Sequence, residues 1–319
     1  MELSSDVGGI EFLSKGHRGP VLLRPKEVVD PFSWLEESRQ RIEEILTTCG
    51  AVVLRDLGLS SVSDFNRAVQ IFSSDLLEYV HRSTPRSRVG GNLYTATEYP
   101  ADRAIPLHNE NSYTDSWPSR IYFYCAVAAE EGGETPTADS RSVYRMIDPT
   151  VREKFERTGV LYVRNFTDGI DLSWQEVFQT SDRAAVNAYC SQHGIDVEWG
   201  TGSPILRTRQ HCQAALDHPR TGERVWFNQA HLFHTSALAA EEELSLIDAL
   251  GVENVPRNAF YGNGDPIEIE VLAHIRGVYE QEKVVTPWQR NDVMILDNLL
   301  FAHGRNPYRG SRKIVVAMS

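Results

Sequence analysis

The stretch Ile121-Tyr-Phe-Tyr-Cys-Ala-Val127 indicates the fold class, because its aromatic and β-branched residues are typical of a buried strand. Strand-like runs of the same kind recur towards the C-terminus, at residues 160–166, 205–209, 225–227, 293–296 and 314–317. Helices are predicted between them, at residues 148–159, 181–193 and 240–250. Many separate strands without regular βαβ alternation predict an antiparallel β-sandwich or barrel with helical insertions.

The N-terminal part of the chain has a different pattern. Two amphipathic helices are predicted at residues 32–49 and 64–80, with a buried strand at residues 51–54 between them. The chain has no internal repeat, low-complexity tract or linker-like concentration of Pro and Gly. We therefore expect one domain over residues 1–319, with residues 1–84 supporting a β-rich core in residues 85–319.

Composition excludes several classes of partner. The 319 residues are 41% hydrophobic and carry a formal net charge of −12, which disfavours nucleic acid and anionic membranes. No apolar run approaches the length of a membrane span, and the first residues do not resemble a signal peptide. We expect a cytoplasmic protein, and the oligomeric state stays open.

Cysteines and clustered histidines offer other potential metal ligands. The four cysteines are widely spaced and form no C-x-x-C pair, so neither a disulfide scaffold nor a zinc ribbon is predicted. Buried packing is the expected role of most of them. The pair His231 and His234 has no acidic or thiolate partner close by, and we interpret it as packing or hydrogen bonding.

The tract Ile105-Pro-Leu-His-Asn-Glu-Asn-Ser-Tyr113 carries the clearest chemical signal. Side chains two residues apart in an extended segment share a face, so His108 and Glu110 can reach one ion together. A third candidate ligand, His303, follows the predicted strand at residues 293–296. Two imidazoles and one carboxylate form the facial triad of non-haem Fe(II) oxygenases, which leaves three coordination positions open.

Such a metal centre can bind a 2-oxo acid as a chelating co-substrate. The far carboxylate of that acid then needs a cation, preferably an arginine, and a hydroxyl donor nearby. Arg312 and Thr135 are the residues that we expect to supply them.

Four separated motifs resemble those of one family. They are His108-x-Glu110, the tract at residues 132–139, Trp226-Phe-Asn-Gln229, and the tract from Asp297-Asn298 through His303-Gly-Arg305 to Arg312. The order and content of these motifs resemble the TauD/TfdA superfamily of Fe(II)/2-oxoglutarate-dependent oxygenases, in particular the branch of clavaminate synthase and the SyrP-like hydroxylases. The resemblance covers roughly residues 85–319, together with the strand at residues 50–55.

The resemblance implies a double-stranded β-helix, or jelly-roll, of the cupin-like type. It implies Fe(II) held by His108, Glu110 and His303, with 2-oxoglutarate and O2 as co-substrates. The family's 2-oxoglutarate-binding Thr falls on Thr135, which is 25 residues after Glu110. The family's Arg is assigned to Arg312, since it opens the final strand, although Arg309 and Lys313 are the alternatives.

Two further comparisons with the resembled family bear on the reaction. Val316 occupies the position at which taurine-type members carry a second arginine, so sulfonates are not expected as substrates. Glu110 is retained, whereas halogenating relatives have a small residue there, so hydroxylation is expected rather than halogenation.

The resemblance also implies a class of substrate, namely an amino acid or amino-acid-derived group in natural-product biosynthesis, free or tethered to a carrier protein. Candidate substrate contacts are Arg86, Asn92, Thr97, Asn111 and Asn228. An acidic carrier would need a basic face, for which the candidates are Arg82, Arg86 and Arg88. Large aromatic residues are expected to wall the barrel, namely Trp226, Phe227 and Trp288.

Two alternative functions stay open. The first is an oxygenase that acts on a free amino acid or small carboxylate, by hydroxylation, desaturation or cyclisation. The second is a non-catalytic jelly-roll binding protein. A descendant that only binds would have no need for the triad together with Thr135 and Arg312, so the enzyme is favoured.

Overall fold

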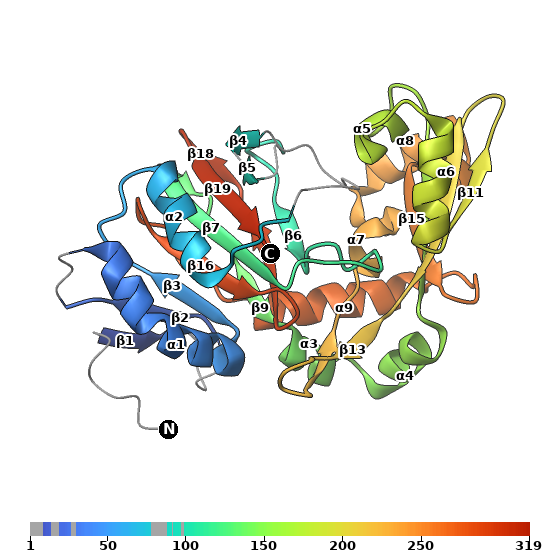
Figure 1. Ribbon diagram of the computed structural model, residues 1–319. Coiled ribbons are helices and arrows are strands. Elements are labelled where there is room, and N and C mark those ends of the chain that lie inside the picture. Colours follow the sequence, from blue (N-terminus) through green and yellow to red (C-terminus); the bar gives the residue numbers. More distant parts are fainter. Residues whose placement is uncertain (1–8, 14–18, 27–29, 78–87, 91, 97–98) are drawn as a thin grey trace.

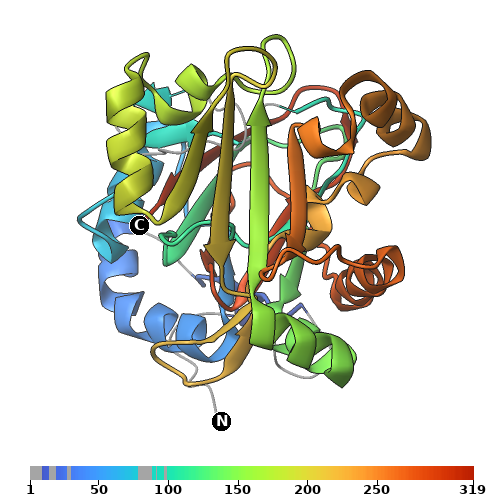
Figure 2. The same ribbon diagram turned by 90° about the vertical axis from the view of Figure 1, so that its right-hand side faces the viewer.

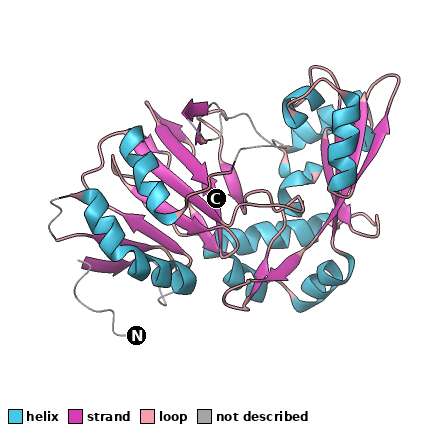
Figure 3. Cartoon of the chain, in the orientation of Figure 1, coloured by secondary structure: helices cyan, strands magenta, loops and turns pink. Residues whose placement is uncertain are grey.

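The computed structural model describes residues 9–13, 19–26, 30–77, 88–90, 92–96 and 99–319. Its strands form an eight-stranded sheet, a three-stranded sheet that packs against it, and a four-stranded sheet further along the molecule (Figure 1). The first two sheets confirm the predicted jelly-roll core. Figure 3 shows that helices lie outside this core, so the predicted helical insertions are also confirmed.

The eight-stranded sheet joins the two ends of the chain. Its neighbouring strands are antiparallel except for one parallel pair, β2 with β3. The strand order is β1 (Gly9–Phe12), β2 (Val21–Arg24), β3 (Ala51–Leu54), β16 (Val293–Asp297), β7 (Arg120–Val127), β19 (Lys313–Met318), β5 (Leu93–Thr95) and β4 (Arg88–Gly90).

Strand β7 shows how this sheet separates two apolar layers. Because successive side chains point to opposite faces, Tyr122 and Tyr124 pack in one cluster, whereas Ile121, Phe123 and Cys125 pack in another. The first cluster is completed by the helices α1 (Pro31–Cys49) and α2 (Val62–Phe72). The second cluster faces the three-stranded sheet and the site described below.

Helix α1 begins and ends where local chemistry predicts. The Asp30 carboxylate accepts a hydrogen bond from the Ser33 backbone N–H, and Pro31 occupies the first turn. Gly50 adopts a φ of 81° at the C-terminal cap, a conformation that favours glycine. The apolar stripe of the helix, including Leu35, Ile42 and Leu46, is buried.

The second predicted helix was too long. Instead of spanning residues 64–80, α2 ends at Phe72, and Ser73 is extended. Ser73 and Ser74 both hydrogen-bond to Asp75, which offers the chain a local alternative to further helical bonds. Leu76 still packs on the core from outside the helix, which explains the misleading apolar periodicity, and residues 78–80 lie outside the described residues.

The three-stranded sheet consists of β6 (Ile105–His108), β17 (Phe301–Arg305) and β9 (Thr137–Asp139), in that order. The register of β6 and β17 shifts between His303 and Arg305. Strand β6 approaches β17 so closely that a Cβ on Gly304 would lie 2.5 Å from the Ile105 carbonyl oxygen. This packing places His303 directly across from His108.

The four-stranded sheet lies on the side of the molecule that faces the viewer in Figure 2. Its order is β11 (Ile195–Trp199), β12 (Leu206–Cys212), β10 (Val160–Phe166) and β15 (Arg257–Tyr261). Its helices and those beside it are α3 (Ser140–Met146), α4 (Pro149–Thr158), α5 (Trp174–Phe178), α6 (Arg183–Gln192), α7 (Ala230–Phe233), α8 (Ala240–Leu250) and α9 (Ile269–Glu282). The short elements are β8 (Glu131–Gly132), β18 (Tyr308–Arg309), β13 (Ala215–Asp217), β14 (Arg224–Trp226), η2 (Thr235–Ala237) and η3 (Val252–Asn254).

Helix α9 was missed by the sequence analysis. Its buried residues Leu272, Ile275 and Tyr279 have helical spacing, so a signal was present, although no side chain caps its N-terminus. The described helices include none that is both long and apolar enough to cross a bilayer. Three of the four cysteines are buried, as predicted, and Cys212 is partly exposed.

His231 is a buried, neutral histidine of the interior. Its Nε2 lies 3.0 Å from the Leu107 carbonyl oxygen, and its ring stacks on Tyr279. Burial lowers the pKa of His231 to about 3, despite the opposing hydrogen bond to Leu107. These contacts agree with the interpretation of this histidine as a packed, hydrogen-bonded residue.

Replacing His231 by glutamine is expected to make the protein less sensitive to acid. The unfolded chain binds a proton at this histidine below pH ~6.5, whereas the folded protein does so only near pH 3. As the pH falls through this interval, the free energy of unfolding of the wild type should therefore decrease by about 1.4 kcal/mol per pH unit more than that of the glutamine variant. Denaturant unfolding from pH 7 to pH 4 measures the difference, and parallel curves for the two proteins would contradict it.

Candidate metal centre and adjoining pocket

Three side chains that could bind a metal meet at the edge of the three-stranded sheet. His108 ends β6, Glu110 follows it, and His303 lies in β17. The two imidazole ring centroids are 4.6 Å apart, and His303 Nε2 lies 3.7 Å from Glu110 Oε2. One ligand atom from each of the three residues lies within 4.8 Å of the others.

The donor set fits Fe(II). The Nδ1 atom of His108 lies 2.9 Å from the Pro106 carbonyl oxygen, which can only accept, so we assign the ring proton to Nδ1. Nε2 of His108 then carries the lone pair that a metal requires. Glu110 is 3% exposed and His303 5% exposed, and a buried carboxylate beside two imidazoles suits a divalent cation.

Asn298 holds the backbone of Glu110. Its Oδ1 accepts the Glu110 N–H at 2.8 Å, and its Nδ2 donates to the Glu110 and Pro118 carbonyl oxygens. Asn109 donates to the Asn298 carbonyl oxygen at 2.6 Å. Gln229 donates to the Asn109 carbonyl oxygen at 2.7 Å. This network joins three of the sequence motifs and orients the carboxylate ligand.

Replacing Asn298 by alanine is expected to weaken Fe(II) binding by about 10- to 100-fold, the usual cost of losing a group that orients a metal ligand. The substitution leaves two buried backbone groups of Glu110 without their partner. Anaerobic titration with Fe(II) measures the effect. Asn263→Ala, on an exposed turn, is the matched control, and wild-type affinity in Asn298→Ala would refute the role.

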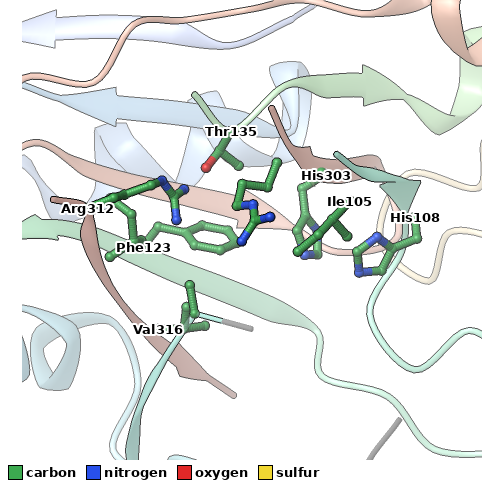
Figure 4. Close-up of a pocket in the computed structure, with 11 residues that line it drawn as sticks. Ile105, His108, Phe123, Thr135, His303, Arg312 and Val316 are labelled. Atoms are coloured by element: carbon green, nitrogen blue, oxygen red, sulfur yellow. The ribbon is translucent and has the colours of Figure 1, made fainter. Parts of the chain in front are cut away.

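A pocket extends from the two histidines into the space between the sheets. Its empty volume is about 400 Å³, the open mouth included. Figure 4 shows His108 and His303 towards one end and Arg312 and Thr135 towards the other, with Phe123 between them. Ile314 and Val316 of β19 contribute apolar walls. An elongated molecule with one polar group at each end fits this arrangement.

Arg312 is fixed at the far end of the pocket. Its Nε donates to the Gly133 carbonyl oxygen at 2.7 Å, and its guanidinium lies beside the Tyr308 ring. Burial lowers the pKa of Arg312 to about 10, and the nearby charge of Arg305 acts in the same direction, so Arg312 stays protonated at neutral pH. It therefore presents a positive charge to an incoming anion.

The pair Gly132-Gly133 allows Arg312 to approach the Gly133 carbonyl oxygen. Gly133 has a φ of 72°, and a Cβ there would lie 3.0 Å from Arg312 Cδ. Two residues later, Thr135 Oγ1 accepts a hydrogen bond from Trp288 Nε1 at 3.1 Å. Indole is only a donor, so the Thr135 hydroxyl keeps its own proton to donate. The tract thus brings a hydroxyl donor and a guanidinium to one end of the pocket.

The alternatives to Arg312 point elsewhere. The Arg309 side chain is 82% exposed and pairs with Glu131, and Lys313 is exposed. Arg312 is the arginine among these basic candidates that lines the pocket. The geometry therefore favours it.

The predicted substrate contacts have varied positions. Arg86 and Thr97 lie outside the described residues, as does Arg82 of the predicted basic face, whereas Arg88 belongs to β4. The Asn92 side chain donates to the Leu76 carbonyl oxygen, and Asn111 directly follows Glu110. Asn228 is fully buried, and its side chain already bonds to the backbone of Ala214 and Ala230, which disfavours a contact with substrate.

Two residues of the site belong to the last sequence motif, although the sequence alone predicted no role for either. Asn298 precedes His303 by five residues, and Arg305 follows it by two. Asn298 orients Glu110, and Arg305 lines the pocket with 4% of its side chain exposed. Trp226 and Phe227 are fully buried, as expected for the barrel wall.

A profile of the family described as "Taurine catabolism dioxygenase TauD, TfdA family" matches residues 22–318. The chain belongs to the TauD/TfdA family. It is therefore a non-haem iron dioxygenase that uses Fe(II), 2-oxoglutarate and O2, as the sequence motifs indicated. The match includes β2 and β3, so it extends further towards the N-terminus than the resemblance seen in the motifs.

Within the TauD/TfdA family, two relatives align with most of the chain. The dapdiamide synthesis protein DdaC of Enterobacter agglomerans is 42% identical over 281 residues, which cover 88% of this chain and 85% of DdaC. A clavaminate synthase-like protein of Arabidopsis thaliana is 30% identical over 294 residues, which cover 89% of this chain and 86% of that protein. The second relative agrees with the branch that the motifs indicated.

A solved structure shows the same fold. PvcB, described as an Fe, alpha-ketoglutarate dependent oxygenase from an isonitrile synthetic pathway, superposes with a TM-score of 0.57. The superposition covers 100% of this chain and 93% of PvcB, at 15% sequence identity. The jelly-roll architecture of the TauD/TfdA family is therefore retained at low sequence identity.

Proposed function

We propose that this dioxygenase hydroxylates an unactivated C–H bond of an amino acid or amino-acid-derived group in natural-product biosynthesis. His108, Glu110 and His303 would hold Fe(II), and Arg312 and Thr135 would bind the distal carboxylate of 2-oxoglutarate. The observation that carries the proposal is the pocket itself, which runs from the two histidines to Arg312 and Thr135.

The residues of the site would divide the work as follows. Bound Fe(II) supplies the activation of O2, coupled to conversion of 2-oxoglutarate to succinate and CO2, with one oxygen atom passing to the substrate. Arg312 and Thr135 orient the co-substrate through charge and hydrogen bonding. Phe123, Ile314 and Val316 exclude water from the pocket.

Two observations support the substrate class: an apolar residue in the pocket and the names of the relatives. Val316 is apolar and 2% exposed where taurine-type members have an arginine, which speaks against a sulfonate. DdaC is named for the synthesis of dapdiamide, and PvcB is described as part of an isonitrile pathway. These names support a role in natural-product biosynthesis.

The first experiment is anaerobic addition of Fe(II) and 2-oxoglutarate to the metal-free protein, followed by visible absorption. A weak metal-to-ligand charge-transfer band is expected. A folded protein that binds Fe(II) but gives no band would contradict the co-substrate site and would favour a binding protein without turnover.

A second experiment addresses the substrate. Amino acids would be supplied free and as thioesters on a carrier protein, with O2, and products identified by mass. A gain of one oxygen atom supports hydroxylation, whereas a loss of two hydrogen atoms would replace it by desaturation or cyclisation. Faster turnover of the thioester would assign a tethered substrate, and equal turnover a free one.

We also propose that residues 1–319 act as one oxygenase domain. Strand β3 from the N-terminal part pairs with β16, which directly precedes the loop of Asn298. Removing the N-terminal segment would leave an edge of β16 without its partner, so we expect a protein that begins at residue 85 not to fold.

A further inference from the structure

Arg305 is a buried cation beside the candidate metal centre. It belongs to β17, two residues beyond His303, and its side chain lines the same pocket as Arg312. Its Nη1 donates to the Tyr99 carbonyl oxygen at 2.9 Å. Its Nη2 donates to the carbonyl oxygens of Pro100 and Arg103, at 2.5 and 2.6 Å. Arg305 therefore ties the segment of residues 99–103 to the strand that carries His303.

These contacts leave part of Arg305 unsatisfied. In the described part of the chain, its buried Nε has no hydrogen-bond acceptor, and no carboxylate forms an ion pair with its guanidinium. Carbonyl oxygens satisfy N–H groups but do not neutralise a charge. A buried guanidinium with an unused donor is costly unless a ligand completes it.

Arg305 and Arg312 line the same pocket and share one aromatic neighbour. The Tyr308 ring is beside both guanidinium groups, at 5.2 Å from the carbon centre of Arg305 and 5.6 Å from that of Arg312. Burial is the main cause of the lowered pKa of Arg312, and the nearby positive charge of Arg305 lowers it further. Among the residues that the structure describes, no carboxylate forms an ion pair with either guanidinium, and two neighbouring cations of this kind favour an anion between them.

We propose that Arg305 is a second co-substrate-binding arginine, whose Nε–H donates to the distal carboxylate of 2-oxoglutarate beside Arg312 and Thr135. The inference rests on the proposed function and adds to it a specificity residue. Because the same guanidinium holds residues 99–103, a bound dicarboxylate would be connected directly to this segment. The pocket would select 2-oxo dicarboxylates over 2-oxo monocarboxylates through two arginines.

The test measures binding, without turnover. Anaerobic, Fe(II)-loaded wild type, Arg305→Gln and Arg305→Lys would be titrated with 2-oxoglutarate and with the monocarboxylate 2-oxobutanoate, followed by the charge-transfer band. Loss of a charged hydrogen bond predicts about tenfold weaker binding of 2-oxoglutarate in Arg305→Gln. The affinity for 2-oxobutanoate should change less than about twofold, and Arg305→Lys should fall between.

The controls separate this role from a structural one. Arg103→Gln removes an exposed cation from the same segment, which pairs with Glu242, and should bind both acids like the wild type. Equal weakening of both acids in Arg305→Gln would show that Arg305 only holds the segment, and an unchanged affinity for 2-oxoglutarate would also overturn the inference. If Arg305→Gln does not fold, the comparison of the two acids in Arg305→Lys decides. A wild type that binds Fe(II) but neither acid would instead refute the proposed function.

Discussion

Replacement of His303 by alanine is expected to abolish the charge-transfer band and to weaken Fe(II) binding by more than about 100-fold. Residues that only orient a metal ligand typically cost 10- to 100-fold, so loss of a ligand should exceed that range. His303 is buried and its ring contacts those of Phe123 and His108, so alanine removes one of the three candidate ligands from a closely packed position. Anaerobic Fe(II) titration and absorption measure both effects.

A matched histidine variant makes this result specific. His211 is exposed on β12, away from the three-stranded sheet, and His211→Ala should bind Fe(II) and give the band like the wild type. Circular dichroism establishes that His303→Ala is folded. A folded His303→Ala protein with wild-type Fe(II) affinity would remove His303 from the proposed ligand set.

Replacement of Arg312 by glutamine is expected to raise the dissociation constant of 2-oxoglutarate by about 100-fold while leaving Fe(II) binding unchanged. A charge pair with hydrogen bonds in a buried site contributes about 3 kcal/mol, and 1.4 kcal/mol corresponds to a factor of ten. Fe(II) binding should be unaffected because Arg312 and the two histidines lie at opposite ends of the pocket (Figure 4). Titration of the charge-transfer band gives the constant.

Arg309→Gln is the control for this prediction. Arg309 lies three residues earlier, carries the same charge, and is exposed beside Glu131. Its loss should change the affinity for 2-oxoglutarate less than about twofold, as expected for an exposed pair. A large effect in Arg309→Gln together with none in Arg312→Gln would transfer the assigned role from Arg312 to Arg309.

Much of the architecture follows from local patterns along the chain. The strand at Ile121–Val127 and the helix that ends at Cys49 were predictable, because alternation of side chains and helix caps are local properties. The end of α2 was not, since Leu76 packs, partly buried, on the core beyond the helix and so extends the apolar pattern. Helix α9 had a regular apolar stripe but lacked the capping residue that marks a start.

The candidate ligands were also visible in the sequence, because His108 and Glu110 form a local pair and the later motifs accompany them in order. Their mutual geometry was not visible. Asn298 contacts Glu110 across a separation of 188 residues, and only the pairing of β6 with β17 brings His303 opposite His108. Arg305 illustrates the same limit. The sequence determines which side chains are available for chemistry. Their burial, their unpaired charges and the pocket that they share are decided only when distant strands pack together.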